Sequence, residues 1–478
     1  MSDTEEPPRP TTDTIRDARC CDEFSRRDLM RRALASSQQQ VPLPAELLEE
    51  GAASFFDKRL TRGQFVGRSA GLVLGLAAAQ AMAPLKLLES AAAAADPSAP
   101  ILVTIYLGGG NDGLNTLAPR AGAERARYDQ LRTSVGIGAD QLLPLTGRED
   151  LGWHPSAAGL RTLFDAGKLA VLTGVDYPDP NMSHFESEHF FRTGTVSSDA
   201  RHGWLGRYLD RVGTGNPLEG IAVQWGGDGA LLGERAATST VHDPGSYGFW
   251  SPGVWDGDHL TDAWGRLGSA GAKSPGYKRA VRTTRQTYQV KKALEPLAKE
   301  KVENLPKPPI AYPEDYQLGE ELRTLGRLLG AGLGTRVATL VDSQGYDTHD
   351  DQATLHAGNL ERLSGALVAW QADLEQRGLA GRVVTMVWSE FGRRAEDNDS
   401  GGTDHGAGGL LLVMGQKVRG EVLSDGWGLS SLDEHGNLRV TTDFRDVYAG
   451  ILEGHLGAGA RDVLPGYKGS PASLFRAA

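Results

Sequence analysis

Four runs of consecutive apolar residues follow Pro97, and each is typical of a strand buried on both faces of a sheet. The stretch from residue 354 to Gly378 instead places apolar residues at helical spacing and ends in glycine, as helices often do. Strands that alternate with helices predict a three-layer α/β/α sandwich with a mostly parallel sheet. The four apolar runs are Ile101–Leu107, Lys168–Val175, Thr335–Asp342 and Gly381–Glu390.

The chain has three parts by composition. Residues 1–50 are polar and proline-containing, which predicts a disordered or helical tail. Residues 51–96 read as a signal-like leader, and residues 97–478 as a single α/β domain. Within that domain the charged segment 275–309 is expected to form a helical excursion that ends in a proline-rich connector. The 478 residues, of which 40% are hydrophobic, are enough for such a core.

Two N-terminal segments together resemble an export signal. "FSRRDLMRR", around Arg26 and Arg27, is similar to a twin-arginine motif, but no apolar core follows it. An apolar run does extend from Ala70 to Leu85, with small residues after it, and it is shorter than the roughly 20 residues that span a bilayer. We therefore expect export by the twin-arginine machinery to the periplasm, the cell surface or the medium, with no stable membrane span in the mature protein. The alternative is a pair of amphipathic helices with no targeting role.

Charge and cysteine content exclude several classes of function. Acidic residues outnumber basic ones, 61 to 50, giving a net charge of -11, and no basic stripe is present. Sequence-independent nucleic-acid binding, which needs clustered Lys and Arg, is therefore not expected. The two cysteines, Cys20 and Cys21, lie in the tail, so any metal in the domain must be bound by His, Asp, Glu or hydroxyl groups.

Polar side chains gather just after the four apolar runs. Ligands bind beyond the carboxyl ends of strands in such sheets, so these residues are expected to line one cleft. The glycine-rich stretch "SGGTDHGAGG" (400–409) adds a further histidine on a backbone that can bend sharply. The candidate residues are Asp112 after the first run, Ser183 after the second, Asp347 and His349 after the third, Glu390 and Arg393 after the fourth, and His405 in the glycine-rich stretch.

These residue types fit a metal site. Asp347, His349 and His405 supply one carboxylate and two imidazoles, a set suited to zinc and acceptable to manganese or iron. Asp112 and Glu390 offer oxygen ligands to a second, harder ion. A metal-bound Ser183 hydroxyl would be a nucleophile near neutral pH. We therefore expect one or two divalent ions, zinc or manganese.

Each candidate also has a structural alternative. Asp112 is suited to cap the helix that begins near Gly113. Ser183 and Glu186 have the spacing of a capping box. Asp347 and His349 are compatible with an Asx-turn, and Glu390 with an ion pair to Arg393 or Arg394. The remaining histidines of the second segment are interpreted as structural, or as contacts behind the ligands or with substrate: His184, His189 and His202.

The motifs, taken in order, resemble the sulfatase-like branch of exported bacterial proteins of unknown function in the alkaline phosphatase superfamily. The similarity extends from about Ile101 to Gly420, and it rests on "LGGGNDGLNTLAP", "NMSHFES", "GYDTHDDQ", "WSEFGRR" and "GTDHG". The resemblance implies an alkaline-phosphatase-like fold. It also implies a two-metal site, with Asp112 as the first metal aspartate and Ser183 as the nucleophile.

The same resemblance assigns the later residues and shows two departures. Asp347 and His349 correspond to the aspartate and histidine of one metal site, with closer spacing than usual, and His405 corresponds to its late histidine. Glu390 stands where an Asp-His pair normally completes the second site, and its neighbour is Phe391. Arg393 is then expected to assist the charge on a phosphate or sulfate group.

Two functions follow as hypotheses. The first is an exported metal-dependent hydrolase of small phosphate or sulfate esters, in which Ser183 attacks and Arg393 assists. The second is a non-catalytic scaffold that keeps the fold and binds a partner in the cell envelope or outside the cell.

Overall fold

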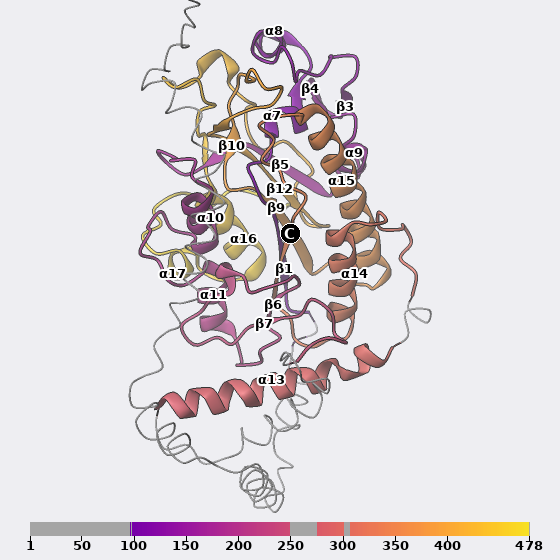
Figure 1. Ribbon diagram of the computed structural model, residues 1–478, viewed down its shortest axis with the longest axis vertical. Helices are drawn as coiled ribbons and strands as arrows, with labels where there is room; N and C mark the ends of the chain where they lie inside the picture. The colour runs from indigo at the N-terminus through magenta and orange to yellow at the C-terminus, as the bar shows by residue number, and fades with distance from the viewer. Residues whose placement is uncertain (1–95, 97, 249–274, 301–305, 478) are drawn as a thin grey trace, which may run out of the picture. The chain divides into compact units, whose positions relative to one another are not determined.

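The computed structural model describes Asp96 and residues 98–248, 275–300 and 306–477 (Figure 1). By its internal contacts the chain divides into two units, Met1–Gln80 with Arg266–Thr283, and Ala81–Gly265 with Thr284–Ala478. Of the first unit, the described part is the beginning of helix α13 (Pro275–Lys299), which lies in the segment expected to be helical. The tail and nearly all of the leader lie outside the described residues, so export stays a prediction. None of the described helices has the length and apolar character to cross a bilayer.

An eight-stranded sheet forms the centre of the second unit, in the order β13-β5-β12-β9-β1-β8-β6-β7. All neighbouring pairs are parallel except the two made by β12, which runs antiparallel to β5 and β9. The strands are β1 (Ile101–Leu107), β5 (Leu169–Asp176), β6 (Gly220–Ala222), β7 (Ser239–Thr240), β8 (Val337–Asp342), β9 (Val383–Trp388), β12 (Gly409–Met414) and β13 (Thr442–Asp443).

Helices cover both faces of this sheet (Figure 1). Alternate residues of each strand enter different cores: Ile101, Val103 and Ile105 pack into one, and Leu102 and Tyr106 into the other. Helices α9 (Ala158–Asp165), α14 (Gln317–Gly330) and α15 (Gln352–Gln376) supply the first core. Helices α10 (His184–Thr193), α11 (Trp204–Val212), α16 (Phe444–Ile451) and α17 (Ala460–Val463) supply the second.

Smaller elements surround the sheet. A three-stranded antiparallel sheet in the order β2-β4-β3 follows β1, and a two-stranded one pairs β10 with β11. These elements are α7 (Gly113–Thr116), β2 (Leu117–Pro119), α8 (Gly122–Leu131), β3 (Leu143–Leu145), β4 (Arg148–Trp153), β10 (Gly392–Arg393) and β11 (His405–Gly406).

The predicted three-layer architecture with a mostly parallel sheet is confirmed. All four apolar runs form strands of the central sheet. Each strand coincides with the predicted run, is shifted from it by one residue, or is shorter than it. The segment with helical spacing forms α15, and the predicted stop at Gly378 has a φ of 70°, a conformation that glycine adopts without strain.

The reversed direction of β12 places the glycine-rich stretch. Because β12 is antiparallel to its neighbours, its amino-terminal end lies at the edge where the parallel strands have their carboxyl ends. His405 lies four residues before the start of β12 and pairs with Arg393 in the β10–β11 ladder. The stretch therefore turns back toward the residues that follow β8 and β9.

Candidate metal centre

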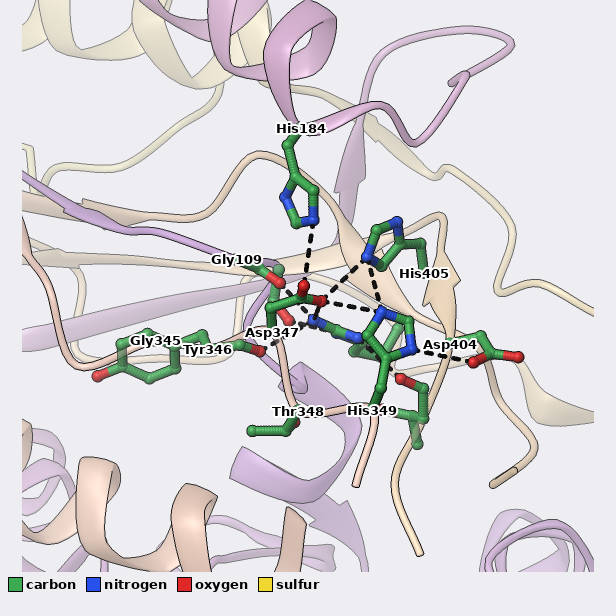
Figure 2. Close-up of polar contacts among 12 residues, drawn as sticks. Gly109, His184, Gly345, Tyr346, Asp347, Thr348, His349, Asp404 and His405 are labelled. Carbon is green, nitrogen blue, oxygen red and sulfur yellow. Dashed lines mark hydrogen bonds and ion pairs between the residues drawn. The ribbon is translucent and has the colours of Figure 1, made fainter. Parts of the chain in front are cut away.

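A compact cluster of imidazoles and one carboxylate lies beyond the carboxyl end of β8. The Nε2 atoms of His349 and His405 are each 3.0 Å from Oδ1 of Asp347 and 3.0 Å from one another. His184, the first residue of α10, approaches from the opposite side, with Nε2 3.5 Å from Oδ2 of Asp347. Figure 2 shows the three imidazoles directed at the Asp347 carboxylate.

The other ring nitrogen of each histidine is held by an oxygen atom. Nδ1 of His184 is 2.8 Å from Oε1 of Glu390. Nδ1 of His349 is 3.1 Å from Oδ1 of Asp404, and Nδ1 of His405 is 3.1 Å from the carbonyl oxygen of Met182. A carbonyl or ionised carboxylate oxygen accepts only, so these Nδ1 atoms donate. In the neutral ring each Nε2 then presents a lone pair toward Asp347.

This arrangement fits a divalent cation. Lone pairs of nitrogen and carboxylate oxygen repel at 3.0 Å unless a proton or a cation lies between them. Zinc bonds nitrogen at about 2.0–2.1 Å, so tetrahedral ligand atoms lie about 3.3 Å apart, close to the observed separations. Among the described residues, ligand atoms of His184, Asp347 and His405 lie within 4.8 Å of one another. Histidines whose second nitrogen donates to an oxygen are typical of metal ligands.

Protonation follows from the same contacts. Burial opposes the charged form of His184, but its hydrogen bonds with Asp347 and Glu390 prevail and raise its pKa to about 9. The hydrogen bond with Asp347 also raises the pKa of His349. Burial lowers the pKa of His405. For Asp347, hydrogen bonds with the three histidines outweigh burial and hold the pKa well below its usual value. Without an ion, a proton on His184 and the Arg393 guanidinium face the Asp347 carboxylate.

Arg393 lies behind Asp347 with its side chain fully buried. Nη2 is 2.6 Å from Oδ1 of Asp347. The remaining donors reach backbone carbonyl oxygens, those of Gly109, Gly110, Tyr346 and Thr403. Because its donors are already used within the protein, the structure makes Arg393 a positioning residue for Asp347. The predicted contact with an ester oxygen would need several of these bonds to break.

Two glycines allow the backbones of the site to approach. A Cβ on Gly109, which has a φ of 118°, would lie 2.4 Å from the amide nitrogen of Asp347. A Cβ on Gly402 would lie 2.2 Å from the carbonyl carbon of His349. Such distances exclude a side chain. The glycine-rich stretch is therefore required by the packing of one site loop against another.

Asp112 does not join the cluster. Its carboxylate is fully buried and accepts hydrogen bonds from Arg132 Nη1 at 2.5 Å, Gln352 Nε2 at 2.6 Å and the Asn115 amide at 3.1 Å. Burial opposes ionisation, but Arg132 outweighs it and lowers the pKa of Asp112. Asp112 thus caps α7, the structural alternative, and its charge is already compensated by an arginine.

Glu390 also lies outside the cluster and contacts it through His184. The carboxylate accepts from the amides of Gly109 and Gly110 at 2.9–3.1 Å and from the Ser389 hydroxyl at 3.0 Å. Its remaining partner is His184, and Arg393 pairs with Asp347 instead. Glu390 therefore contacts a histidine of the cluster, and the predicted direct role as ligand to a second ion has no support in its hydrogen bonds.

Ser183 occupies the N-cap position of α10 between two residues of the site. Its hydroxyl makes no capping hydrogen bond, and Glu186 bonds Asn181 and Ser198, so the capping-box alternative is wrong. The preceding Met182 has a φ of 55°, which is strained for a side chain of its kind and persists where surrounding contacts require it. This conformation directs the Met182 carbonyl to His405.

His184 and Asp404 belong to the site, although the sequence pattern did not single them out as ligands. The sequence indicates a structural role for His184, or a contact behind the ligands or with substrate, yet its ring faces Asp347. The centroid of this ring lies 4.9 Å from that of Phe391 and 4.4 Å from that of His405. Its position directly after Ser183 was the available signal. Asp404 supports His349. By contrast His189 faces the carbonyl of Ser197, 3.3 Å away.

Part of the chain matches a known protein family. Residues 274–474 match a family described as "Protein of unknown function (DUF1501)". No curated protein is significantly similar in sequence. Among solved structures, Ps i-CgsB in complex with a neocarrahexaose has a TM-score of 0.34 at 10% identity, covering 78% of this chain and 75% of its own.

Two further structures have similar values. The PsFucS1 sulfatase from Pseudoalteromonas sp. has a TM-score of 0.29 at 12% identity, covering 69% of this chain and 66% of its own. TAB5 alkaline phosphatase has a TM-score of 0.28 at 9% identity, covering 66% of this chain and 91% of its own. Similarity at this level carries no argument about the reaction, which must be argued from the site itself.

Proposed function

We propose that this protein is a metal-dependent hydrolase of small phosphate or sulfate esters that binds one divalent ion through Asp347, His349 and His405. The observation that supports it is the triangle of ligand atoms, each 3.0 Å from the other two, with the Nδ1 atoms of both histidines held by oxygen acceptors. Two imidazoles and a carboxylate favour zinc, with manganese as an alternative.

The ion, when bound, would polarise an ester oxygen and stabilise negative charge on the nucleophile or the leaving group. The residues of the chain itself would hold the ligands in position and supply the nucleophile. Arg393 holds Asp347, and Met182 and Asp404 hold the two histidines. Ser183, whose hydroxyl makes no capping bond, is the proposed nucleophile that attacks phosphorus or sulfur. As the serine oxygen bonds to phosphorus or sulfur, the bond to the alcohol oxygen would break and the serine proton would leave with the alcohol. Water would then cleave the serine ester and restore the hydroxyl.

A second candidate function is a non-catalytic scaffold with one structural ion that binds a partner in the cell envelope or outside the cell. One observation favours it: Asp112 and Glu390, the expected ligands of a second ion, are both committed to other partners. Structural ions are surrounded by protein ligands, whereas catalytic ions keep a position open to substrate.

Turnover and metal content together distinguish the two. The full chain, loaded with zinc or manganese, is assayed with p-nitrophenyl phosphate and p-nitrophenyl sulfate, beside Ser183→Ala, His405→Ala and the exposed-serine control Ser430→Ala. We expect Ser183→Ala to lose turnover and keep its metal, His405→Ala to lose both, and Ser430→Ala to keep both. Turnover that survives Ser183→Ala removes the serine mechanism. Bound metal without turnover of any ester supports the scaffold instead.

A further inference from the structure

The hydrogen bond between Glu390 and His184 is the contact that the proposed reaction leaves unused. His184 begins α10, and Glu390 follows β9, so the pair connects two segments of the site that lie far apart in the sequence. The ring of His184 is confined further by Phe391 and by His405. Because Nδ1 is fixed by Glu390, Nε2 is directed toward Asp347 Oδ2.

Glu390 is itself held rigidly. Its residue is 0% exposed, and both carboxylate oxygens accept from the turn after β1 and from Ser389. The two amides and His184 donate to it, and the Ser389 hydroxyl shares its one hydrogen between Glu390 and the Leu107 carbonyl oxygen, which is 2.6 Å away. A glutamine at this position would turn an amide NH₂ group toward at least one of these donors. The contacts therefore require a group that only accepts, which a carboxylate is.

We propose that Glu390 is a positioning residue that aims His184 at the ion as a fourth protein ligand, in which case a substrate oxygen would have to bind as a fifth. This inference rests on the proposed metal site and extends it. A common ion is within reach, because ligand atoms of His184, Asp347 and His405 lie within 4.8 Å of one another. Carboxylates that orient a metal-bound histidine typically contribute about 10- to 100-fold to metal affinity. Glu390 would act wholly through His184, since its own oxygens are occupied.

A double-mutant cycle tests this dependence. Zinc affinity of the full chain is measured by chelator competition for wild type, Glu390→Gln, His184→Ala and the double variant, and cobalt(II) absorption reports the coordination geometry. We expect each single variant to weaken zinc binding by about 10- to 100-fold and to change the cobalt spectrum in the same way. The double variant should be no weaker than His184→Ala, because removing the ring removes what Glu390 positions.

The matched control is Asp404→Asn, which removes the carboxylate behind His349. Its effect on zinc affinity should add to that of His184→Ala, because the two carboxylates hold different rings. If Glu390→Gln does not fold, Glu390→Asp takes its place. This variant keeps the charge, withdraws it by one methylene, and should show the same non-additivity.

The outcomes separate the two claims. Loss of zinc binding in Asp347→Asn with no change in Glu390→Gln would overturn the role of Glu390 and leave the metal site standing. Additive losses in the Glu390 and His184 cycle would do the same, because they would show Glu390 acting elsewhere. Equal zinc affinity in wild type and Asp347→Asn would overturn the metal site and, with it, this inference.

Discussion

Asp112 and Asp347 follow neighbouring parallel strands, yet their surroundings are opposite in kind. Asp112 is enclosed by groups that can only donate, among them the Arg132 guanidinium, whose side chain is 0% exposed. Asp347 is 39% exposed and faces three imidazoles whose donating nitrogens are used elsewhere. Both carboxylates pair with a buried arginine, but Asp347 also faces three imidazole nitrogens and solvent. The metal site is thus distinguished by the imidazoles gathered around its carboxylate and by access to solvent.

The largest expected effect comes from Asp112→Asn. The substitution leaves Arg132 buried without its counterion, so we expect the free energy of unfolding to fall by about 3–5 kcal/mol. Zinc affinity of the folded fraction should be unchanged. Urea denaturation and chelator competition measure the two quantities. A large drop in zinc affinity would show that Asp112 contributes to the ion after all.

The same substitution at Asp347 should behave in the opposite way. Asp347→Asn removes a proposed ligand, so zinc affinity should fall by more than the about 100-fold upper value for supporting groups. Water reaches this position, and Arg393 keeps its carbonyl partners, so the free energy of unfolding should change less than in Asp112→Asn. Competition titration of both variants side by side checks the contrast, which fails if the affinities are equal.

A third carboxyl group sharpens the comparison through the pH dependence of stability. Asp176, at the end of β5, is fully buried, and within the described part of the chain its carboxylate accepts from the amides of Tyr177 and Gly408. Burial raises its pKa to about 8. The folded state therefore keeps a proton that the unfolded chain releases near pH 4, and stability decreases between about pH 4 and 8, by up to about 1.4 kcal/mol per pH unit.

Asp176→Asn should remove this slope, because an amide does not ionise. Denaturation in urea at pH 5 and at pH 8 provides the check. At pH 5 we expect the variant to be no more stable than wild type, since its NH₂ group faces an amide donor. At pH 8 the difference in the free energy of unfolding should shift in favour of the variant. Parallel stability curves for the two proteins would show that Asp176 is ionised throughout.

The sequence predicted the strands well, because each is an unbroken apolar run that both cores require. It also grouped Asp347, His349 and His405, which the structure brings together. It also predicted Asp112 as a ligand of a second ion, because the compensating Arg132 lies 20 residues later in the chain and meets Asp112 only in the folded structure. Pairing of that kind depends on packing, and no local pattern reports it.

The roles of Glu390 and His184 also depend on tertiary contacts that the sequence does not report. The position of Glu390 after β9 predicted a ligand, but its carboxylate turns to the amides of the β1 turn. His184 was read as one of several histidines near the start of a helix. Which of them faces Asp347 depends on how α10 docks and on the backbone of Met182, and both are consequences of tertiary structure.

The antiparallel insertion of β12 has a consequence for the order of folding. β12 pairs with β9, which is close in the sequence, and with β5, which is more than 200 residues away, and His405 takes its place only once that strand is seated. Pairings between distant segments are slow to form. An ion that needs His405 would therefore bind late, and would favour only molecules whose central sheet is complete.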